Sequence, residues 1–200
     1  MKLHHGIIVV ALLPLQGFAD EEKLERAEYF PAKTFGEEKE LHDFIADWYS
    51  GQLLAMGELP LPKRAGDKEA VIYRFTCLRT FHRPFCVKLT KIKRGYLLER
   101  KVLSGKGGYE PGKIEESAKS KVTDAAVLLL EDLLVELKFL KMKSTVDEVG
   151  GRDGSQWILE VVKDGRYKIV DRWTPGDGAP MWKIGEWFLG KAMWKPKELY

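Results

Sequence analysis

Cysteine and histidine, the residues that most often carry metal and nucleophilic chemistry, are scarce in this chain. There are two cysteines, Cys77 and Cys86, and four histidines among 200 residues. Two of these histidines lie within the first five residues, which leaves His42 and His82 in the body of the chain. Neither has a second ligand at the usual zinc-site spacing, so we expect no metal and no cofactor. The sequence also lacks a G-x-S-x-G elbow, which argues against a serine nucleophile.

Long apolar runs are missing everywhere except at the N-terminus. Lys2 precedes the apolar run from Gly6 to Leu15, and Gly17-Phe18-Ala19 follows it as a small-x-small cleavage pattern. This arrangement predicts a signal peptide over residues 1–19 and a mature chain that begins at Asp20. The run is shorter than the roughly 20 residues of a membrane helix, although an uncleaved anchor is the alternative. We therefore expect export to the periplasm or the medium, with no membrane span after cleavage.

A strong charge of either sign is also lacking. Lysine and arginine number 33, aspartate and glutamate 30, and the net charge is +3. Nucleic-acid binders usually have a larger basic excess, so we expect no nucleic-acid partner. Basic residues do gather between residues 74 and 101. They fall on both strand faces rather than in one stripe, but they could still attract an anionic envelope component as a partner. The alternative is that these lysines and arginines protect strand edges from aggregation. The oligomeric state is left open.

The strongest structural pattern runs from Asp153 to Pro175. Two β-rich runs, 157–162 and 167–173, flank Asp164-Gly165, which is typical of a type I′ hairpin turn. The turn predicts a register in which Val162 faces Tyr167. One face of the hairpin then carries Trp157, Leu159, Val161, Val170 and Arg172, and the other carries Ile158, Glu160, Val162, Tyr167, Ile169, Asp171 and Trp173. Both faces are largely apolar, which predicts cover on both sides.

The same stretch resembles a known family. The pattern Asp153-Gly154-x-x-Trp157-x-x-Glu160, followed by Tyr167-x-x-Val170-x-Arg172-Trp173-x-Pro175, is similar to one in small exported bacterial proteins of unknown function. The resemblance covers the hairpin and, more loosely, residues 120–190. It implies an exported α+β domain, and it supplies no catalytic residues.

The other elements follow from periodicity and turn residues. Thr34 and Glu37 form a capping-box pattern ahead of an expected helix, and Thr123 is placed to cap a second one. The order predicts an α+β fold, in which an antiparallel three-stranded meander and the hairpin pack with a long apolar helix and flanking amphipathic helices. The expected segments are a mobile lead-in (20–33), a single domain (34–195) and a frayed tail (196–200). Within the domain, helices are expected at 35–50, 124–141 and 181–193, and the first of them ends near Gly51 or runs on to Gly57. Meander strands are expected at 71–81, 85–92 and 96–103.

The two cysteines lie on neighbouring strands of the expected meander. If Phe81-His82 forms the turn, Cys77 faces Cys86 in a pair whose Cα atoms approach to about 4.5 Å. A disulfide is feasible at that separation and agrees with an oxidising compartment. A four-residue turn would shift the register and leave two buried free thiols instead.

The glycine-rich stretch from Gly107 to Lys113 has the letters of a phosphate-binding loop, G-x-x-x-x-G-K. Its next residue, Ile114, has no hydroxyl for Mg²⁺, and Pro111 removes one amide from the cradle. We therefore predict a plain flexible loop.

The best candidate site is on the hairpin. Trp157, Glu160, Arg172 and Trp173 combine aromatic and charged groups of the kind that favour interfaces and ligand pockets. Glu160 and Asp171 are diagonal neighbours and could act as paired carboxylates. The alternative is that the tryptophans are core residues and that the carboxylates are held by arginine or tyrosine.

These patterns favour an exported, non-enzymatic domain that binds an envelope protein or an anionic envelope component. A carboxylate-dependent hydrolase of an envelope component, acting through Glu160 or Asp171, is the alternative. A structural subunit of an envelope assembly is the third hypothesis, which an exposed patch around Trp182, Trp187 and Trp194 would favour. The position of Glu160 separates the first two, because a catalytic acid lines a cleft and a structural one is buried against arginine.

Overall fold

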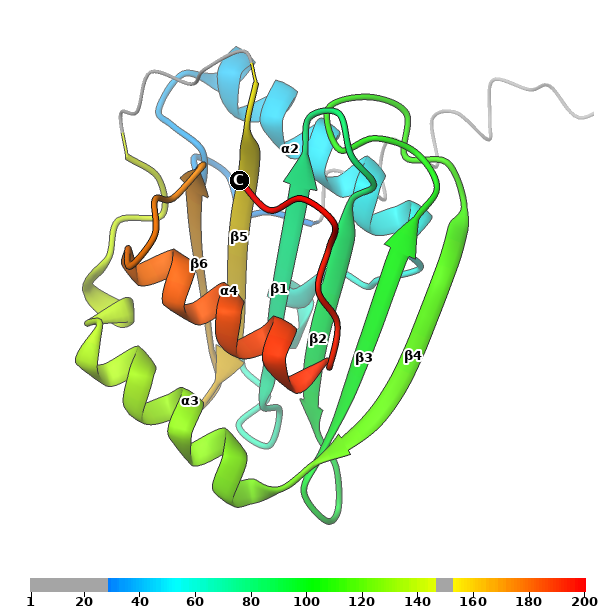
Figure 1. The fold of residues 1–200 in the computed structure, drawn as a ribbon. Helices are drawn as coiled ribbons and strands as arrows, with labels where there is room; N and C mark the ends of the chain where they lie inside the picture. Colours follow the sequence, from blue (N-terminus) through cyan, green and yellow to red (C-terminus); the bar gives the residue numbers. More distant parts are fainter. Residues whose placement is uncertain (1–28, 147–152) are drawn as a thin grey trace, which may run out of the picture.

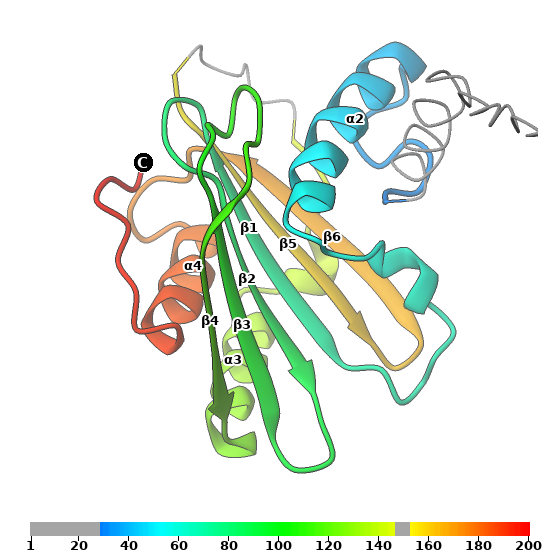
Figure 2. The same cartoon turned by 90° about the vertical axis from the view of Figure 1, so that its right-hand side faces the viewer.

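The computed structural model describes residues 29–146 and 153–200. In these residues a six-stranded antiparallel sheet carries helices on both faces (Figures 1 and 2). The order across the sheet is β4-β3-β2-β1-β5-β6. The predicted α+β class is confirmed. The strands are β1 (Ile72–Arg79), β2 (Phe85–Lys91), β3 (Tyr96–Leu103), β4 (Ile114–Val122), β5 (Ser155–Lys163) and β6 (Arg166–Trp173).

The meander has four strands, β1 to β4, where three were predicted. The additional strand, β4, pairs with β3 over most of its length, with Arg100 opposite Ala118 and Tyr96 opposite Val122. It forms one edge of the sheet, and most of its side chains are exposed. A strand with little buried surface has no apolar alternation, and the sequence pattern therefore did not reveal it.

The β5–β6 hairpin has the predicted register. Val162 lies opposite Tyr167, and Trp157 lies opposite Arg172. Asp164 and Gly165 both have positive φ, at 52° and 71°, as a type I′ turn requires. Strand β5 also pairs with β1, so the hairpin is part of the sheet and β6 forms its second edge.

Two helices, α3 (Asp124–Glu136) and α4 (Pro180–Lys191), cover one face of the sheet, and α2 (Lys39–Ala55) covers the other (Figure 2). The core beneath α4 is aromatic: Phe75 stacks on Phe188 at 5.7 Å and meets Trp157 edge-on at 5.4 Å. Gly185 lets α4 approach this closely, because a Cβ at that position would lie 2.2 Å from Trp157. Short 3₁₀ turns η1 (Leu61–Arg64) and η2 (Phe139–Lys141) follow α2 and α3.

The long apolar helix predicted for residues 124–141 is not confirmed. Thr123 caps α3 as expected, but the helix has 13 residues and ends at Glu136. Lys138 then adopts the left-handed conformation, with φ at 55°, and the chain turns into η2. Only Val127 and Leu130 of α3 are buried, so this helix is far more exposed than its composition predicts.

The start of α2 also differs from the prediction. The helix begins at Lys39, and its N-cap, Glu38, makes no side-chain capping hydrogen bond. Thr34 instead donates its hydroxyl to the Pro31 carbonyl oxygen at 2.6 Å. The structure describes residues 29–33 of the expected mobile lead-in. Of these, Tyr29 and Phe30 are buried in the core beneath α2. The predicted signal peptide lies outside the described residues.

The C-terminal tail, predicted to be frayed, is packed across β1 and β2 (Figure 1). Arg79 donates a hydrogen bond to the Glu198 carbonyl oxygen at 2.5 Å. The His82 ring and the Tyr200 hydroxyl are hydrogen-bonded at 2.8 Å. These bonds fix the tail against the β1–β2 turn.

The glycine-rich loop between β3 and β4 is also fixed rather than free. The amide of Gly107 donates to the carbonyl oxygens of Arg79 and His82 at 2.9 and 3.0 Å. The Gly107 carbonyl oxygen accepts a hydrogen bond from Trp48 of α2 at 2.7 Å. The amide of Gly107 is therefore already bonded within the protein, and the loop connects α2 to β1 through hydrogen bonds.

Candidate functional site

The residues of the predicted hairpin site lie on opposite faces of the sheet. Trp157 and Arg172 belong to the face covered by α4, while Glu160, Asp171 and Trp173 belong to the face covered by α2. The sheet therefore separates Trp157 and Arg172 from Glu160 and Asp171.

Trp157 is a core residue. Its side chain is fully buried, and it stacks on Trp182 of α4 with ring centroids 5.2 Å apart. Its indole nitrogen donates a hydrogen bond to the Ser155 hydroxyl at 2.8 Å. A tryptophan with every surface occupied in this way stabilises the fold and offers no surface to a ligand.

Glu160 is buried against Arg74 of β1. Arg74 donates from Nε and Nη2 to the two carboxylate oxygens, at 2.7 and 2.8 Å, and both side chains are completely inaccessible. The Tyr167 hydroxyl donates a third hydrogen bond to Glu160 at 3.0 Å. Burial works to lower the pKa of Arg74, but the charge and hydrogen bonds of Glu160 more than offset this effect and raise it. This arrangement is the one expected of a structural carboxylate.

Asp171 is also buried, and it accepts a hydrogen bond from the hydroxyl of Tyr49 on α2 at 2.8 Å. Burial, followed by the charge of Asp171, raises the pKa of Tyr49 well above its ordinary value. This hydrogen-bonded pair joins α2 to the sheet within the core that lies between them. Glu160 and Asp171 are thus diagonal neighbours beneath a helix rather than two acids that line a cleft.

Arg172 and Trp173 are the only members of the predicted group that are not buried. Arg172 donates hydrogen bonds to the carbonyl oxygens of Lys143 and Ser144, at 3.0 and 3.3 Å, and so ties the segment after η2 to β6. Both residues border a hollow of about 660 Å³ beside the start of α4. Trp182, Trp187 and Trp194 do not form an exposed patch. All three pack against the core and are half-buried.

The Arg74–Glu160 pair belongs to a larger buried network that the sequence did not reveal. Glu58, in the loop after α2, accepts hydrogen bonds from Lys88 and Lys101 at 2.9 and 2.6 Å, and it lies 3.8 Å from Arg74. Burial acts to lower the pKa of Lys88, but Glu58 outweighs it and the pKa is raised. Basic residues of the meander that looked like an anion surface are thus partly internal, and they fasten the α2 loop to the sheet.

The disulfide predicted between Cys77 and Cys86 is not formed. Cys77 lies opposite Phe85, and Cys86 lies opposite Thr76. The connection between β1 and β2 is longer than the two-residue turn assumed, and this change places the two cysteines on opposite faces of the sheet. Both are buried free thiols, and burial raises the pKa of each to about 12.

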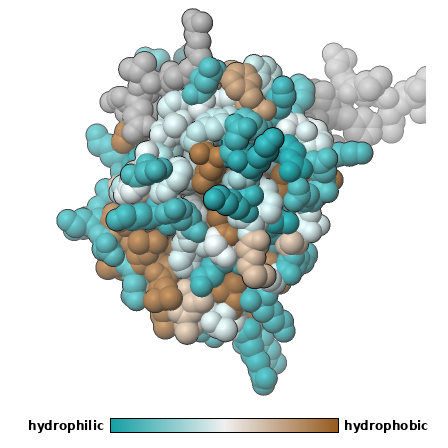
Figure 3. Space-filling view, viewed as in Figure 1, coloured by the Kyte–Doolittle hydropathy of each residue, from teal (hydrophilic) through white to brown (hydrophobic). Residues whose placement is uncertain are grey.

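A groove is present on the α3 side of the molecule, between the end of α3, η2 and the turn of the β5–β6 hairpin. Its volume is about 670 Å³. Val135 and Leu140 stand at its edge with 77% and 76% of their surface exposed. Figure 3 shows apolar side chains gathered over α3, where Leu128 and Leu129 are also exposed. The apolar lining consists of Leu134, Val135, Phe139, Leu140 and Val161, together with the rings of Tyr73 and Tyr167.

The charged lining of this groove is mostly basic. Lys138, Lys141, Lys163, Arg166 and Lys168 face two acids, Glu131 and Asp164, which leaves an excess of three positive charges. Within residues 29–146 and 153–200, the side chains of Lys138, Lys141 and Arg166 take part in no ion pair.

Glu131 is the one acid fixed at the inner end of the groove. Its Oε1 atom accepts hydrogen bonds from the Tyr73 hydroxyl and from Lys163, each at 2.6 Å. Burial alone would raise the pKa of Glu131, but the hydrogen bonds from Lys163 and Tyr73 outweigh it and hold the pKa below its usual range. A carboxyl group that ionises so readily is a poor proton acceptor at neutral pH, and this favours binding over acid–base chemistry.

Sequence reasoning missed this groove because it predicted one continuous helix over 124–141, whereas α3 ends at Glu136 and the chain turns at Lys138. The interspersed lysines at 138 and 141 were the available signal. Among the described residues, there is no group of three or more histidine, cysteine or acidic side chains that could hold a metal ion. In the same residues, none of the helices combines the length and apolar character that crossing a bilayer requires.

No family model matches this chain, and no curated protein is significantly similar to it.

Proposed function

We propose that this chain is an exported, non-enzymatic binding domain and that the groove between α3, η2 and the β5–β6 turn is its binding surface. The observation that carries the proposal is the groove itself. Ligand sites are concave and mostly apolar, with a few placed polar groups, and they typically enclose 300–1,000 Å³. A groove of about 670 Å³ with exposed Val135 and Leu140 at its edge has these properties.

The hydrolase alternative has less support. Glu160 is enclosed by Arg74 and Tyr167, and Asp171 is bonded to Tyr49 beneath α2. Water and substrate would have to displace buried partners to reach either acid. Turnover of envelope substrates by the purified protein, lost on Glu160→Gln but with the fold intact, would revive this alternative.

The export part of the proposal rests on the N-terminal pattern and on the resemblance of the hairpin to small exported bacterial proteins. Mass spectrometry of the protein isolated from its own cells tests it directly. We expect a mature chain that begins at Asp20 and is recovered from the periplasm or the medium. A chain that retains residues 1–19 in the cytoplasm would contradict it.

Binding in the groove is tested with a neutral apolar fluorophore, N-phenyl-1-naphthylamine. We expect the purified chain to bind this probe and Val135→Asp to weaken binding by about tenfold, a loss of roughly 1.4 kcal/mol. Leu129→Asp is the matched control, because Leu129 is exposed on the same helix but does not line the groove. The proposal fails if the unchanged chain does not bind the probe, or if both variants lose binding equally.

A further inference from the structure

The groove combines an apolar wall with cations at its rim, and this combination restricts what it can hold. Phe139 is buried at its base, while Val135 and Leu140 leave most of their surface open. A purely polar ligand would leave this apolar surface in water. A purely apolar ligand would lie among basic groups that it cannot pair.

The rim cations are available to a ligand. Lys138, Lys141 and Arg166 are exposed and make no ion pair within the described residues, whereas Lys163 is already bonded to Glu131. Exposed cations beside an apolar wall attract anionic groups, and a guanidinium matches the geometry of a carboxylate or a phosphate. Charge complementarity therefore requires an anionic head.

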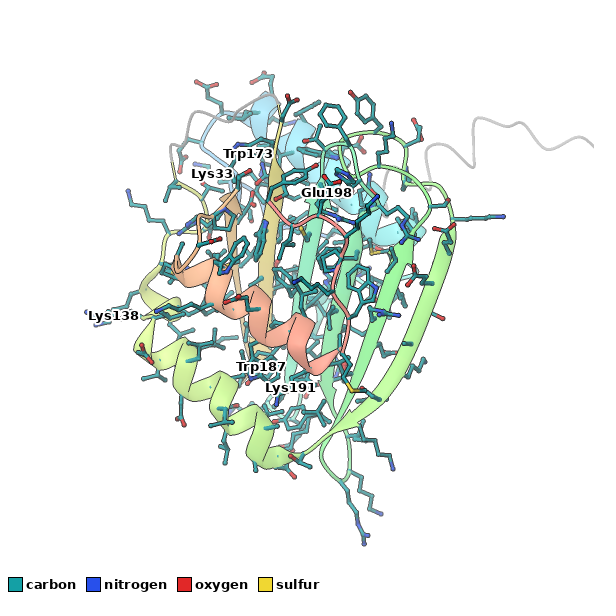
Figure 4. All side chains as sticks on the ribbon, in the orientation of Figure 1. Lys33, Lys138, Trp173, Trp187, Lys191 and Glu198 are labelled. Carbon is teal, nitrogen blue, oxygen red and sulfur yellow. The ribbon has the colours of Figure 1, made fainter. Side chains whose placement is uncertain are left out.

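The backbone at Lys138 places this lysine where α3 gives way to η2. The residue has φ at 55°, in the position after a helix end where glycine is usual. A side chain in this conformation costs roughly 1–2 kcal/mol. The chain nevertheless has a lysine here, at the end of α3 and at the edge of the molecule (Figure 4). The same conformation occurs at Lys33, Thr174 and Met193, so at Lys138 it marks the end of α3 rather than a functional site by itself.

The outer surface of α3 argues against a flat anionic bilayer as the partner. Asp132 and Glu136 are exposed on this helix alongside Leu128 and Leu129. These acids would face the negative headgroups of a membrane if the helix lay on it. A single molecule held within the groove meets the lysines and avoids Asp132 and Glu136, which do not line it.

From these observations we infer that the occupant of the groove is a single-chain anionic amphiphile, an acyl or alkyl chain that ends in a carboxylate or phosphate group. The chain lies along Leu134, Val135 and Leu140, and the head is bound by Lys138, Lys141 and Arg166. This inference rests on the proposed function, because it names the ligand class of the same groove.

The test is displacement of N-phenyl-1-naphthylamine by four monomeric competitors: decyl phosphate, decanoate, decanol and inorganic phosphate. We expect decyl phosphate and decanoate to compete about tenfold more tightly than decanol, a difference of roughly 1.4 kcal/mol. Inorganic phosphate alone should not displace the probe. The double variant Lys138→Gly/Lys141→Gln should weaken decyl phosphate by about tenfold, since each exposed pair contributes up to about 1 kcal/mol. Its affinity for decanol should be unchanged.

Lys143→Gln is the matched control, because this exposed lysine follows η2 but does not line the groove. If decanol binds as tightly as decyl phosphate, the inference is overturned while the proposed function stands. If the chain fails to bind the probe or any competitor, both fail. Co-sedimentation with phosphatidylglycerol vesicles, without binding of monomeric decyl phosphate, would overturn the inference in favour of a bilayer surface.

Discussion

Two sets of charged side chains in this molecule lie in opposite surroundings. Beneath α2, Arg74 and Glu160 are completely inaccessible and satisfy each other with paired hydrogen bonds. At the groove, Lys138 and Lys141 are exposed beside apolar surface and form no ion pair within the described chain. The comparison indicates that the first set maintains the architecture and that the second set is available for binding. Each set can be altered without touching the other.

The largest expected effect comes from breaking the buried pair. Arg74→Met leaves Glu160 buried without its main partner, and we expect a loss of about 3–5 kcal/mol in the free energy of unfolding. Urea denaturation measures this loss. The double variant Arg74→Met/Glu160→Leu should recover most of it, because a buried ion pair can be replaced by apolar residues of similar volume. A single variant as stable as the parent would show that the pair is not structural.

A smaller effect on stability is expected where α4 meets the sheet. It measures how tightly α4 packs on the aromatic core of that face. Gly185→Ala places a methyl group 2.2 Å from Trp157, and overpacking of this kind costs about 1–3 kcal/mol. Gly190→Ala, on the same helix, meets no atom within 4 Å and should stabilise the protein by about 0.5–1 kcal/mol. The midpoints of thermal unfolding of the two variants should shift in opposite directions from that of the parent. A shift of the same sign in both would contradict the described packing of α4.

The smallest stability effect is expected at the groove, and its sign is the informative part. Lys138→Gly removes a side chain from the left-handed conformation and should stabilise the fold by about 1 kcal/mol in urea denaturation. An unfolding free energy lowered by more than about 1 kcal/mol would place Lys138 with the structural charges instead. The comparison between the two sets would then fail.

The elements predicted well are those whose geometry is determined by neighbouring residues. Asp164-Gly165 determines a turn by its own backbone preferences, and the register of the whole hairpin follows from it. Thr123 caps α3 through a contact three residues away. For the same reason, the distribution of Trp157, Glu160 and Arg172 over two faces could be derived from the sequence.

The errors arise where a feature depends on distant contacts or on loop length. The disulfide prediction assumed a two-residue turn, and a longer connection moved Cys86 to the other face. Glu58 lies far from Lys88 and Lys101 in the sequence, so its buried network could not be derived from local pattern. The left-handed Lys138, which ends α3 early, has no glycine to signal it. The groove was missed as a consequence.

The most direct test of the central claim is to map a bound ligand on the isotope-labelled chain by NMR, with decyl phosphate as the ligand. The hollow of similar volume that competes with the groove at α3 and η2 is the one beside Arg172 and Trp173 at the start of α4. We predict that amide shifts change in residues 134–141 and 161–168 and stay constant around residues 172–181. Changes confined to the second hollow would contradict the account.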